Sequence, residues 1–248
     1  MMQLKATDAI HRSILYKILT AIADDSILSQ ELIFKGGTCA VLLGWLDRFS
    51  VDLDFDLVKG VSKAAITKGL EQIFDQLSLP VVQKHPMVLM YKVKYSSDPT
   101  ARKTIKVSVN DERVAASQFA PQYLADIDRT MMCQTRETMV AHKMIALIGR
   151  YEKKRQIAGR DVYDIHEFFL RAYPYNTEVI SERTKLSPRQ YVQKMILFIE
   201  QNVTQRVIDE DINLLLPPKP FQAIRKTLKQ ETLMLLRTEL ERLEVGKR

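Results

Sequence analysis

Two short motifs near the N-terminus contain the residue types that bind phosphate groups and metal ions. Gly36, Gly37 and Thr38 follow one short apolar run, and Asp52 and Asp54 lie one residue apart in a second. Glycines let the backbone approach a ligand closely, and amide groups at the start of a helix attract phosphate oxygens. Residues i and i+2 of a strand point to the same face, so the two carboxylates converge and suit a divalent cation. The motifs together predict a site for a nucleoside triphosphate (NTP) with Mg²⁺ or Mn²⁺.

Each motif alone also has an ordinary structural explanation. A Gly-Gly pair usually forms a turn, and two aspartates one residue apart usually mark a solvated strand edge. Both motifs together, separated by one helix length, are much less expected by chance. Lys35, Arg48 and Ser50 flank the motifs and extend the candidate nucleotide site. Arg48 either pairs with Asp47 or faces the triphosphate, and the Thr38 hydroxyl serves either the helix N-terminus or a phosphate.

The C-terminal half contains a second set of charged residues in an apolar helical pattern. Lys143 lies within Val-Ala-His-Lys-Met-Ile-Ala-Leu, where an ammonium group must reach solvent or meet an anion. Asp161 and Asp164 follow at positions i and i+3, on one face of a predicted helix. The ordinary alternatives are a lysine whose stem extends to water and a pair of aspartates that compensate a helix dipole.

These residues resemble a known family. Lys35–Thr38, Arg48–Phe55, Lys143 and the sequence Arg-Asp-Val-Tyr-Asp at 160–164 resemble the AbiEii/AbiGii toxin-like nucleotidyltransferases, within the polymerase-β-type nucleotidyltransferase fold. The resemblance covers about a third of the chain. It implies that Lys143 binds the nucleotide phosphates and that Asp161 or Asp164 completes the catalytic group, with the choice between them open.

The same resemblance implies an activity and a biological role. A nucleoside monophosphate would pass from an NTP to an RNA acceptor, with the 3′ end of tRNA as the leading candidate. The protein would be the toxin of a toxin–antitoxin or phage-defence system and would have a cognate antitoxin.

One feature departs from the family pattern. Where the fold often places a third carboxylate, a predicted strand carries Ser108 and Asn110 on the same face as Lys106, with Asp111 just beyond.

Two alternative functions are therefore retained. The missing carboxylate favours a catalytically impaired protein that keeps the fold and binds RNA or a partner. The other alternative is an enzyme of the same fold that modifies a protein hydroxyl.

Basic residues that join the two C-terminal motifs form either a solvated face or contacts to RNA phosphates: Arg150, Lys153, Lys154, Arg155 and Arg160.

The elements that must position these residues indicate an α+β fold. Residues 1–134 are predicted to form a nucleotidyltransferase-like mixed sheet with helices, and residues 135–248 a mostly helical region. Apolar periodicity predicts helices at 7–23, 38–46, 62–77, 137–151, 161–172, 188–203 and 220–243. Strands are predicted at 32–34, 51–57, 87–95 and 104–109, the last two as a hairpin, with a short extended piece at 126–132.

Composition narrows the class of protein further. A net charge of +7 favours an acidic partner such as nucleic acid, and 46% hydrophobic residues suffice for a packed core. No apolar run reaches the ~18 residues of a membrane helix, and the first residues lack the apolar segment of a signal peptide. Cys39 and Cys133 have no metal-ligand spacing and are expected to be buried. We expect a cytoplasmic protein without a membrane partner.

Overall fold

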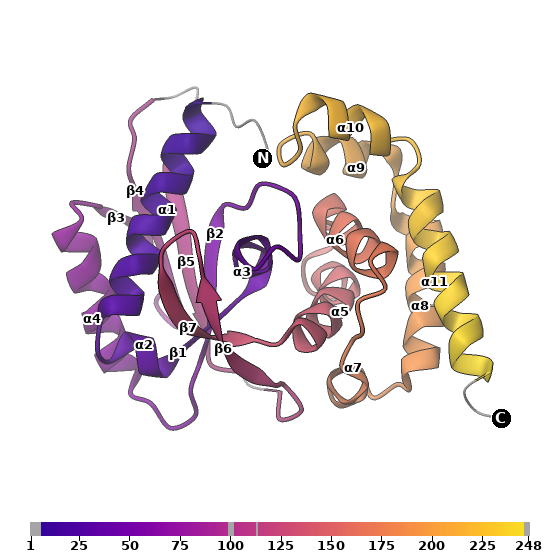
Figure 1. The fold of residues 1–248 in the computed structure, drawn as a ribbon, viewed down its shortest axis with the longest axis horizontal. Coiled ribbons are helices and arrows are strands. Elements are labelled where there is room, and N and C mark those ends of the chain that lie inside the picture. Colours follow the sequence, from indigo (N-terminus) through magenta and orange to yellow (C-terminus); the bar gives the residue numbers. More distant parts are fainter. Residues whose placement is uncertain (1–5, 99–101, 113, 246–248) are drawn as a thin grey trace. The chain divides into compact units, whose positions relative to one another are not determined.

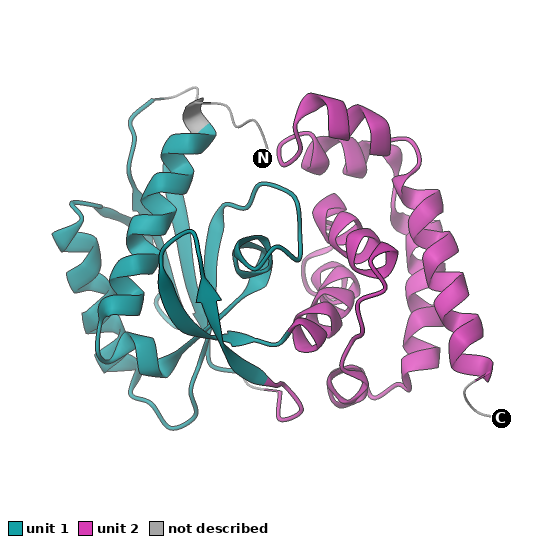
Figure 2. Ribbon diagram, in the orientation of Figure 1, with its two compact units in different colours: residues 1–113, 119–135 teal, residues 114–118, 136–248 magenta. Residues whose placement is uncertain are grey.

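The computed structural model describes residues 6–98, 102–112 and 114–245 of the 248-residue chain (Figure 1). The chain divides into two compact units. Unit 1 comprises residues 1–113 and 119–135, and unit 2 comprises residues 114–118 and 136–248 (Figure 2). Each unit is described by itself below.

The strands of unit 1 form one seven-stranded mixed sheet in the order β3-β4-β5-β2-β1-β7-β6. They are β1 (Leu32–Lys35), β2 (Asp52–Leu57), β3 (Val81–Lys84), β4 (Leu89–Lys94), β5 (Thr104–Asn110), β6 (Phe119–Leu124) and β7 (Arg129–Gln134). The central pairs β2–β5 and β1–β7 are parallel, whereas every other neighbouring pair is antiparallel. Strands that are distant in sequence therefore meet at the centre of the sheet.

One face of this sheet is apolar and the other carries polar side chains. The helices of unit 1 are α1 (Ala6–Asp24), α2 (Leu28–Glu31), α3 (Gly36–Leu42) and α4 (Lys63–Gln76). Leu53, Val107 and Tyr91 are register partners across β2, β5 and β4, and all three are fully buried. Phe74 of α4 lies against Tyr91 with ring centroids 5.5 Å apart, so α4 covers this apolar face. Because side chains alternate along a strand, Asp52 and Asp54 point to the other face.

Unit 2 is built from helices. They are α5 (Arg136–Lys154), α6 (Gly159–Leu170), α7 (Thr177–Thr184), α8 (Pro188–Asn202), α9 (Gln205–Ile212), α10 (Pro218–Ile224) and α11 (Leu228–Val245). Helix α6 packs against α5, α9 and α11, and α11 also packs against α8. The first turn of α8 is fixed by a capping box between Ser187 and Gln190, with Pro188 at the first helical position. The central helix α6 is thus the best enclosed element of this unit.

Hydrogen bonds attach residues 114–118 to unit 2, although they lie between β5 and β6 in the chain. The backbone amides of Ala115 and Ala116 each donate to the Glu182 carboxylate at 2.8 Å. The amide of Gln118 donates to the Thr138 hydroxyl at 3.0 Å. The two amides lower the pKa of Glu182, so its charged form is the one that holds the segment.

The predicted α+β class is confirmed, and so is the antiparallel pairing of the two predicted hairpin strands. The helix predicted at 38–46 instead begins at Gly36 and ends at Leu42, so the two glycines form its first residues and not a turn before it. The helix predicted at 220–243 is two helices, α10 and α11.

Several short elements escaped prediction, namely α2, α7, α9, β3 and β6. Each has four to eight residues, too few for a clear apolar period. Strand β6 also contains Pro121, which has no backbone N–H to donate, but β6 is an edge strand and tolerates it. Among the described residues, no helix is both long and apolar enough to cross a membrane.

Candidate active site

The predicted carboxylates lie side by side on the polar face of the sheet. Strand β2 is flanked by β1 and β5, and Asp54 is the register partner of both Lys35 and Ser108. Asp52 is the register partner of Lys106. The side chains of Asp52 and Asp54 are 27% and 30% exposed, so both remain accessible to a ligand.

Strand β5 supplies two groups that contact the carboxylates directly. The Ser108 hydroxyl donates a hydrogen bond to Asp54 Oδ1 at 2.5 Å. Lys106 Nζ lies 3.3 Å from Asp52 Oδ2 and 3.7 Å from Asp54 Oδ1. The ammonium group therefore offsets the repulsion between two carboxylates that the strand forces to the same side. The sequence had placed Lys106 and Ser108 on one face of a strand but not beside the aspartates.

A third carboxylate on the same face was missed by sequence reasoning. Asp56 continues the alternation that begins with Asp52 and Asp54, and only 6% of the residue is exposed. Lys35 Nζ lies 2.5 Å from Asp56 Oδ1, and Gln134 Nε2 donates to Oδ2 at 2.7 Å. The ammonium group of Lys35, predicted to bind nucleotide, thus pairs with a buried carboxylate. The signal was present in the sequence as three aspartates at i, i+2 and i+4.

The two glycines allow α3 to begin directly against the carboxylate strand. Gly36 has φ +81°, and a Cβ there would lie 3.0 Å from Asp54 Oδ2. A Cβ on Gly37 would lie 2.7 Å from Arg48 Nη2 and 3.1 Å from Ser50 Oγ. A side chain at either position would therefore collide with the candidate site. The glycines leave backbone exposed where any other residue would block it.

The remaining predicted nucleotide-binding residues are tied to the same loop. The Thr38 hydroxyl donates to the Asp52 main-chain oxygen at 2.5 Å and lies 2.8 Å from Ser50 Oγ. Arg48 is 4% exposed, and its Nη1 donates to the Phe49 main-chain oxygen at 2.9 Å. Thr38 therefore anchors α3 to the start of β2, and Arg48 lies beneath the second glycine. The structure brings together all the predicted site residues of unit 1.

The donor set at Asp52 and Asp54 fits a magnesium-type ion. Such an ion prefers oxygen ligands and is usually held by one or two carboxylates together with substrate phosphates. Within the described ranges, no group of three or more His, Cys, Asp or Glu side chains could hold a metal by itself. Asp111, which lies beyond the predicted third-carboxylate positions, forms an exposed ion pair with Lys63. An ion at this site would complete its coordination with substrate and water.

The predicted residues of unit 2 form a cluster of their own. Lys143 Nζ lies 2.7 Å from Asp164 Oδ2 and 3.6 Å from Asp161 Oδ1. Arg150 Nε lies 3.2 Å from Asp161 Oδ2. Both aspartate side chains are at most 1% exposed, whereas 15% of the Lys143 side chain is exposed. The lysine therefore has carboxylate partners, and part of its side chain remains accessible.

The predicted basic cluster divides into two groups. Arg150 is engaged by Asp161, and Arg160 is partly buried in the first turn of α6. Lys153, Lys154 and Arg155 are exposed at the end of α5 and just beyond it. These last three are the exposed members of the cluster, and they are called the α5 basic end below.

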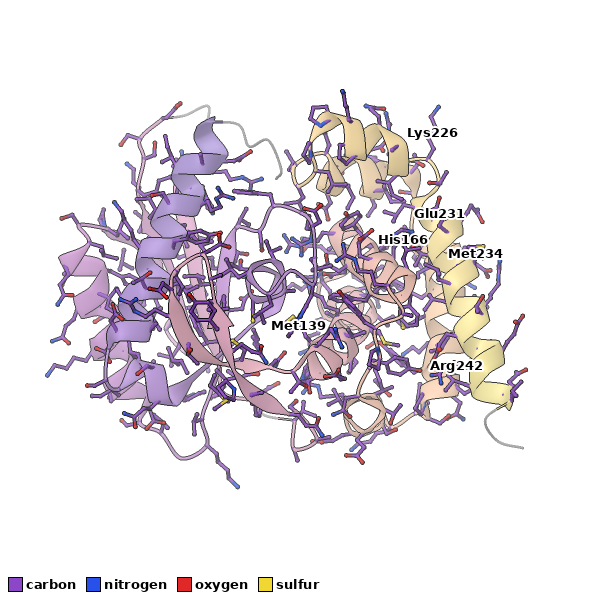
Figure 3. The ribbon with its side chains drawn as sticks, in the orientation of Figure 1. Met139, His166, Lys226, Glu231, Met234 and Arg242 are labelled. Atoms are coloured by element: carbon purple, nitrogen blue, oxygen red, sulfur yellow. The ribbon has the colours of Figure 1, made fainter. Side chains whose placement is uncertain are left out.

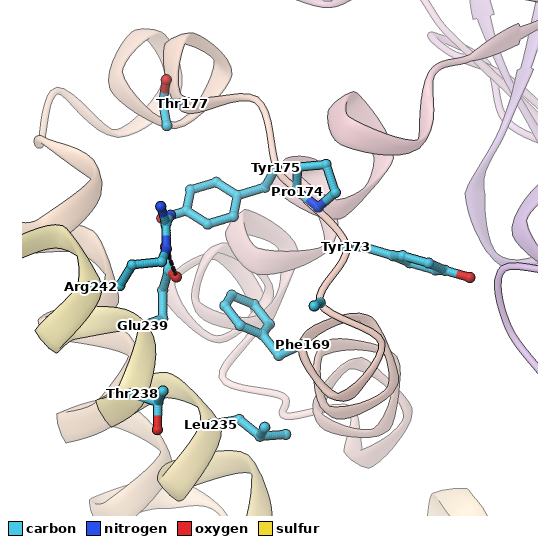
Figure 4. Close-up of a pocket in the computed structure, with 10 residues that line it drawn as sticks. Phe169, Tyr173, Pro174, Tyr175, Thr177, Leu235, Thr238, Glu239 and Arg242 are labelled. Carbon is cyan, nitrogen blue, oxygen red and sulfur yellow. Dashed lines mark hydrogen bonds and ion pairs between the residues drawn. The ribbon is translucent and has the colours of Figure 1, made fainter. Parts of the chain in front are cut away.

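A pocket of about 460 Å³ lies elsewhere in unit 2, between α6, the loop after it and α11 (Figure 4). Its polar groups are paired with one another. Glu239 accepts hydrogen bonds from the Tyr175 hydroxyl at 2.7 Å and from Arg242 Nε at 2.6 Å. None of the predicted site residues line it. The network fastens the loop to α11.

Comparison with known proteins agrees with this description. The sequence profile of a family described as "Nucleotidyl transferase AbiEii toxin, Type IV TA system" matches residues 17–232. A Helicobacter pylori protein described as a nucleotidyltransferase has a similar structure, with a TM-score of 0.59 and 17% identity over 97% of this chain and 99% of that one. MenT4, a nucleotidyltransferase toxin from Mycobacterium tuberculosis, gives a TM-score of 0.52 and 16% identity over 95% and 87% of the two chains.

No curated protein matches the sequence significantly. At such low identities the two structures show the fold alone, and the family profile carries the rest. The profile covers most of the chain, including both predicted motif regions, so the resemblance inferred from sequence and the enzyme class are confirmed. The chain belongs to the AbiEii family of nucleotidyltransferase toxins.

Proposed function

We propose that this toxin transfers a nucleoside monophosphate from an NTP to RNA, with a divalent cation held by Asp52 and Asp54. The observation that carries the proposal is the close approach of Gly36 to Asp54, where a single added carbon would lie 3.0 Å from a carboxylate oxygen. Bare glycine backbone held directly beside accessible carboxylates lets phosphate groups and their metal ion approach both. A side chain at Gly36 would press on the Asp54 carboxylate.

The chemistry needs little covalent participation by the protein. An acceptor hydroxyl oxygen forms a bond to the α-phosphorus, the bond from that phosphorus to the bridging oxygen breaks, and pyrophosphate leaves. The hydroxyl proton passes to water. A bound cation would neutralise phosphate charge and favour the attacking oxygen. Ser108 fixes the orientation of the Asp54 carboxylate, and the bare backbone of Gly36 and Gly37 keeps side chains out of the path of the triphosphate. Positioning and electrostatics are the main requirements of such a transfer.

We further propose that Lys143 binds nucleotide phosphates, as the family resemblance implies. Lys143 is the partly exposed member of its cluster and would contact the phosphates with its ammonium group. Asp164 Oδ2 lies 2.7 Å from the Lys143 ammonium group, and Asp161 Oδ2 lies 3.2 Å from Arg150 Nε. Both aspartates therefore act as positioning residues for cations. A lysine held in this way is preorganised for the charge that develops on the phosphates.

The proposed acceptor is the 3′ end of tRNA. The net charge of +7 and the exposed α5 basic end support a nucleic-acid acceptor. Membership of a family described as part of a type IV toxin–antitoxin system implies an antitoxin, and we propose that both proteins act in the cytoplasm.

A labelling experiment tests the proposal. Purified protein is incubated with each α-labelled NTP, Mg²⁺ and total RNA, and we expect one or more nucleotides to label the tRNA fraction. Ribonuclease should remove the label, and the variant Asp54→Asn should not produce it. Label that resists ribonuclease but follows a protein band would replace RNA with a protein acceptor. No label and no pyrophosphate release by the wild type would refute transfer.

One observation favours a second candidate, an RNA-binding protein without catalysis. The strand beside the carboxylates carries Lys106 and Ser108, so no third carboxylate lies there. Pyrophosphate release separates the two functions because binding alone cannot produce it. RNA binding that is unchanged in Asp54→Asn, together with no pyrophosphate from the wild type, would favour this candidate.

A further inference from the structure

We infer that Lys106 is a built-in counter-ion that keeps divalent cations out of the Asp52–Asp54 pair until a nucleotide arrives. The inference rests on the proposed function, because it assumes that these carboxylates are the metal ligands. It assigns a role to a positioning residue that neither the motifs nor the family match identifies.

The position of Lys106 follows from the register of three strands. Lys92 on β4, Lys106 on β5 and Asp52 on β2 are register partners and share one face of the sheet. Like charges directly opposite each other on antiparallel strands repel. Lys92 on one side and Asp52 on the other therefore both favour a Lys106 side chain that leans toward β2. Its ammonium group lies 3.3 Å from Asp52 and 3.7 Å from Asp54.

The consequence for metal binding is electrostatic. Lys106 Nζ interacts with Oδ2 of Asp52 and Oδ1 of Asp54, oxygens that a divalent cation would also use. Two carboxylates beside one ammonium group also carry one net negative charge in place of two. Ser108 is neutral, so strand β5 contributes no additional negative charge to offset the lysine. The nucleotide-free site is therefore a poor metal site.

A nucleotide changes this balance because it brings its own negative charges. Phosphate oxygens can accept the Lys106 ammonium group, which releases Asp52 and Asp54 for the ion. The same phosphates also serve as ligands of the ion. Metal and nucleotide binding should consequently be coupled, and linkage requires the coupling to be reciprocal.

Mn²⁺ binding to the nucleotide-free protein tests the inference without any reaction. Electron paramagnetic resonance measures free Mn²⁺ for the wild type, Lys106→Met, Lys106→Arg and Lys92→Met. We expect roughly tenfold tighter binding for Lys106→Met, since a unit charge is lost beside both ligands at a partly exposed site. Lys106→Arg keeps the charge and should resemble the wild type. Lys92→Met removes the same charge one strand farther from the ligands and should change affinity much less.

Thermal unfolding provides a second readout. Removal of the ammonium group leaves two carboxylates facing each other, so Lys106→Met should melt below the wild type in a chelator. Added Mn²⁺ should then raise its melting temperature more than that of the wild type. If Lys106→Met does not fold, Lys106→Gln keeps a hydrogen-bond donor and answers the same question. Mn²⁺ binding by folded Lys106→Met or Lys106→Gln that is unchanged or weaker than that of the wild type would overturn the inference.

The outcomes also separate this inference from the proposed function. A non-hydrolysable NTP with Mn²⁺ should stabilise the wild type, and Asp54→Asn should abolish that stabilisation. If neither happens, the metal site itself is refuted, and the proposed function with it. If both happen but Lys106→Met binds Mn²⁺ like the wild type, only the role of Lys106 is refuted.

Discussion

Lys143 Nζ lies 2.7 Å from Asp164 Oδ2, and the Asp164 side chain is completely buried. A lysine in this arrangement has a structural function as well as any catalytic one, because the carboxylate has been removed from water and needs its partner. The ammonium group also lies 3.6 Å from Asp161 Oδ1, a buried atom that makes no hydrogen bond among the described residues. Two buried carboxylates therefore depend on Lys143, helped by Arg150 on the Asp161 side.

Lys143→Met should destabilise the protein by about 3–5 kcal/mol, because it leaves a buried carboxylate without its cation. Transfer activity should fall by orders of magnitude as well. The double variant Lys143→Met/Asp164→Asn should recover much of the stability but none of the activity. Chemical denaturation and the labelled-NTP assay measure the two effects. A single variant that is as stable and as active as the wild type would remove Lys143 from both roles.

Asp52→Asn and Asp54→Asn should each abolish transfer while the protein remains folded. A neutral amide cannot replace a carboxylate as a ligand of a divalent cation, whereas both side chains are partly exposed and tolerate the change in size. Asp111→Asn is the matched control, because it alters an exposed ion pair with Lys63 away from the carboxylate pair. On overexpression, the first two variants should relieve growth arrest and the control should not. Continued arrest by soluble Asp54→Asn would argue against transfer as its cause.

Gly36→Ala should reduce both stability and activity. The positive φ disfavours any side chain by about 1–2 kcal/mol, and the added carbon would press on Asp54 Oδ2. Gly60→Ala separates the two effects, since Gly60 has φ +87° but open space around its missing side chain. It should lose similar stability and keep its activity. Equal activity in the two variants would show that the close approach at Gly36 is unrelated to transfer.

Neutralising the α5 basic end should weaken RNA binding without affecting NTP binding. If Lys153, Lys154 and Arg155 each bind one phosphate, neutralising each should reduce the slope of log affinity against log salt by about one, independently of RNA sequence. Neutralising the exposed lysines Lys219 and Lys226 provides the control, and the change in slope is compared per charge removed. Filter binding over a range of salt concentrations measures the slopes. Equal slopes for both sets of variants would mean that net charge alone, and no particular surface, attracts RNA.

The stability that His166 contributes to the helical unit should be lost as the pH rises. The side chain joins α6 to α11, where its Nε2 lies 2.9 Å from Glu231 (Figure 3). Burial lowers its pKa, but hydrogen bonds with Glu167 and Glu231 outweigh this and raise the pKa above 6.5. The folded state therefore binds the proton more tightly than the unfolded state. The stabilisation is complete below pH 6.5 and disappears as the pH passes the raised value.

The measurement compares wild type with His166→Gln by denaturation at several pH values. The stability difference between them should shrink as the pH rises from about 6 to about 9. Glu231→Gln should weaken the same trend, since it removes one of the two carboxylates that raise the pKa. A difference that grows with pH would show that His166 is buried in its neutral form.

Alternation along a strand is a local property, and for that reason the sequence was sufficient to place Asp52 and Asp54 on one face. It was equally sufficient for the long amphipathic helices α1, α4 and α8, whose apolar period is visible in any window. The short elements lack that signal. The start of α3 at Gly36 was missed for a different reason, since two glycines indicate a turn more often than the first turn of a helix.

The partners of the site residues could not be predicted, because they depend on contacts between distant segments. Lys106 reaches Asp52 only because β2 and β5 pair in parallel with a specific register. Asp56 was visible in the sequence, but its partner Gln134 lies 78 residues away on β7. The position of Lys143 inside an apolar helix predicted the need for an anion. Only the packing of α5 on α6 shows that Asp164 meets that need most closely.

The parallel pairs at the centre of the sheet also bear on how the nascent protein acquires activity. Strands β1 and β2 leave the ribosome early, but their outer partners β7 and β5 are synthesised many residues later. Pairings of this kind form slowly, because a long loop must close before the two strands can meet. Asp54 cannot accept its hydrogen bond from the Ser108 hydroxyl until β5 emerges, and Asp56 cannot accept its hydrogen bond from the Gln134 amide until β7 emerges. A chain that ended before β7, whose last residue is Gln134 of 248, would carry the glycine and aspartate motifs without the full set of these hydrogen bonds, and we expect it to be inactive.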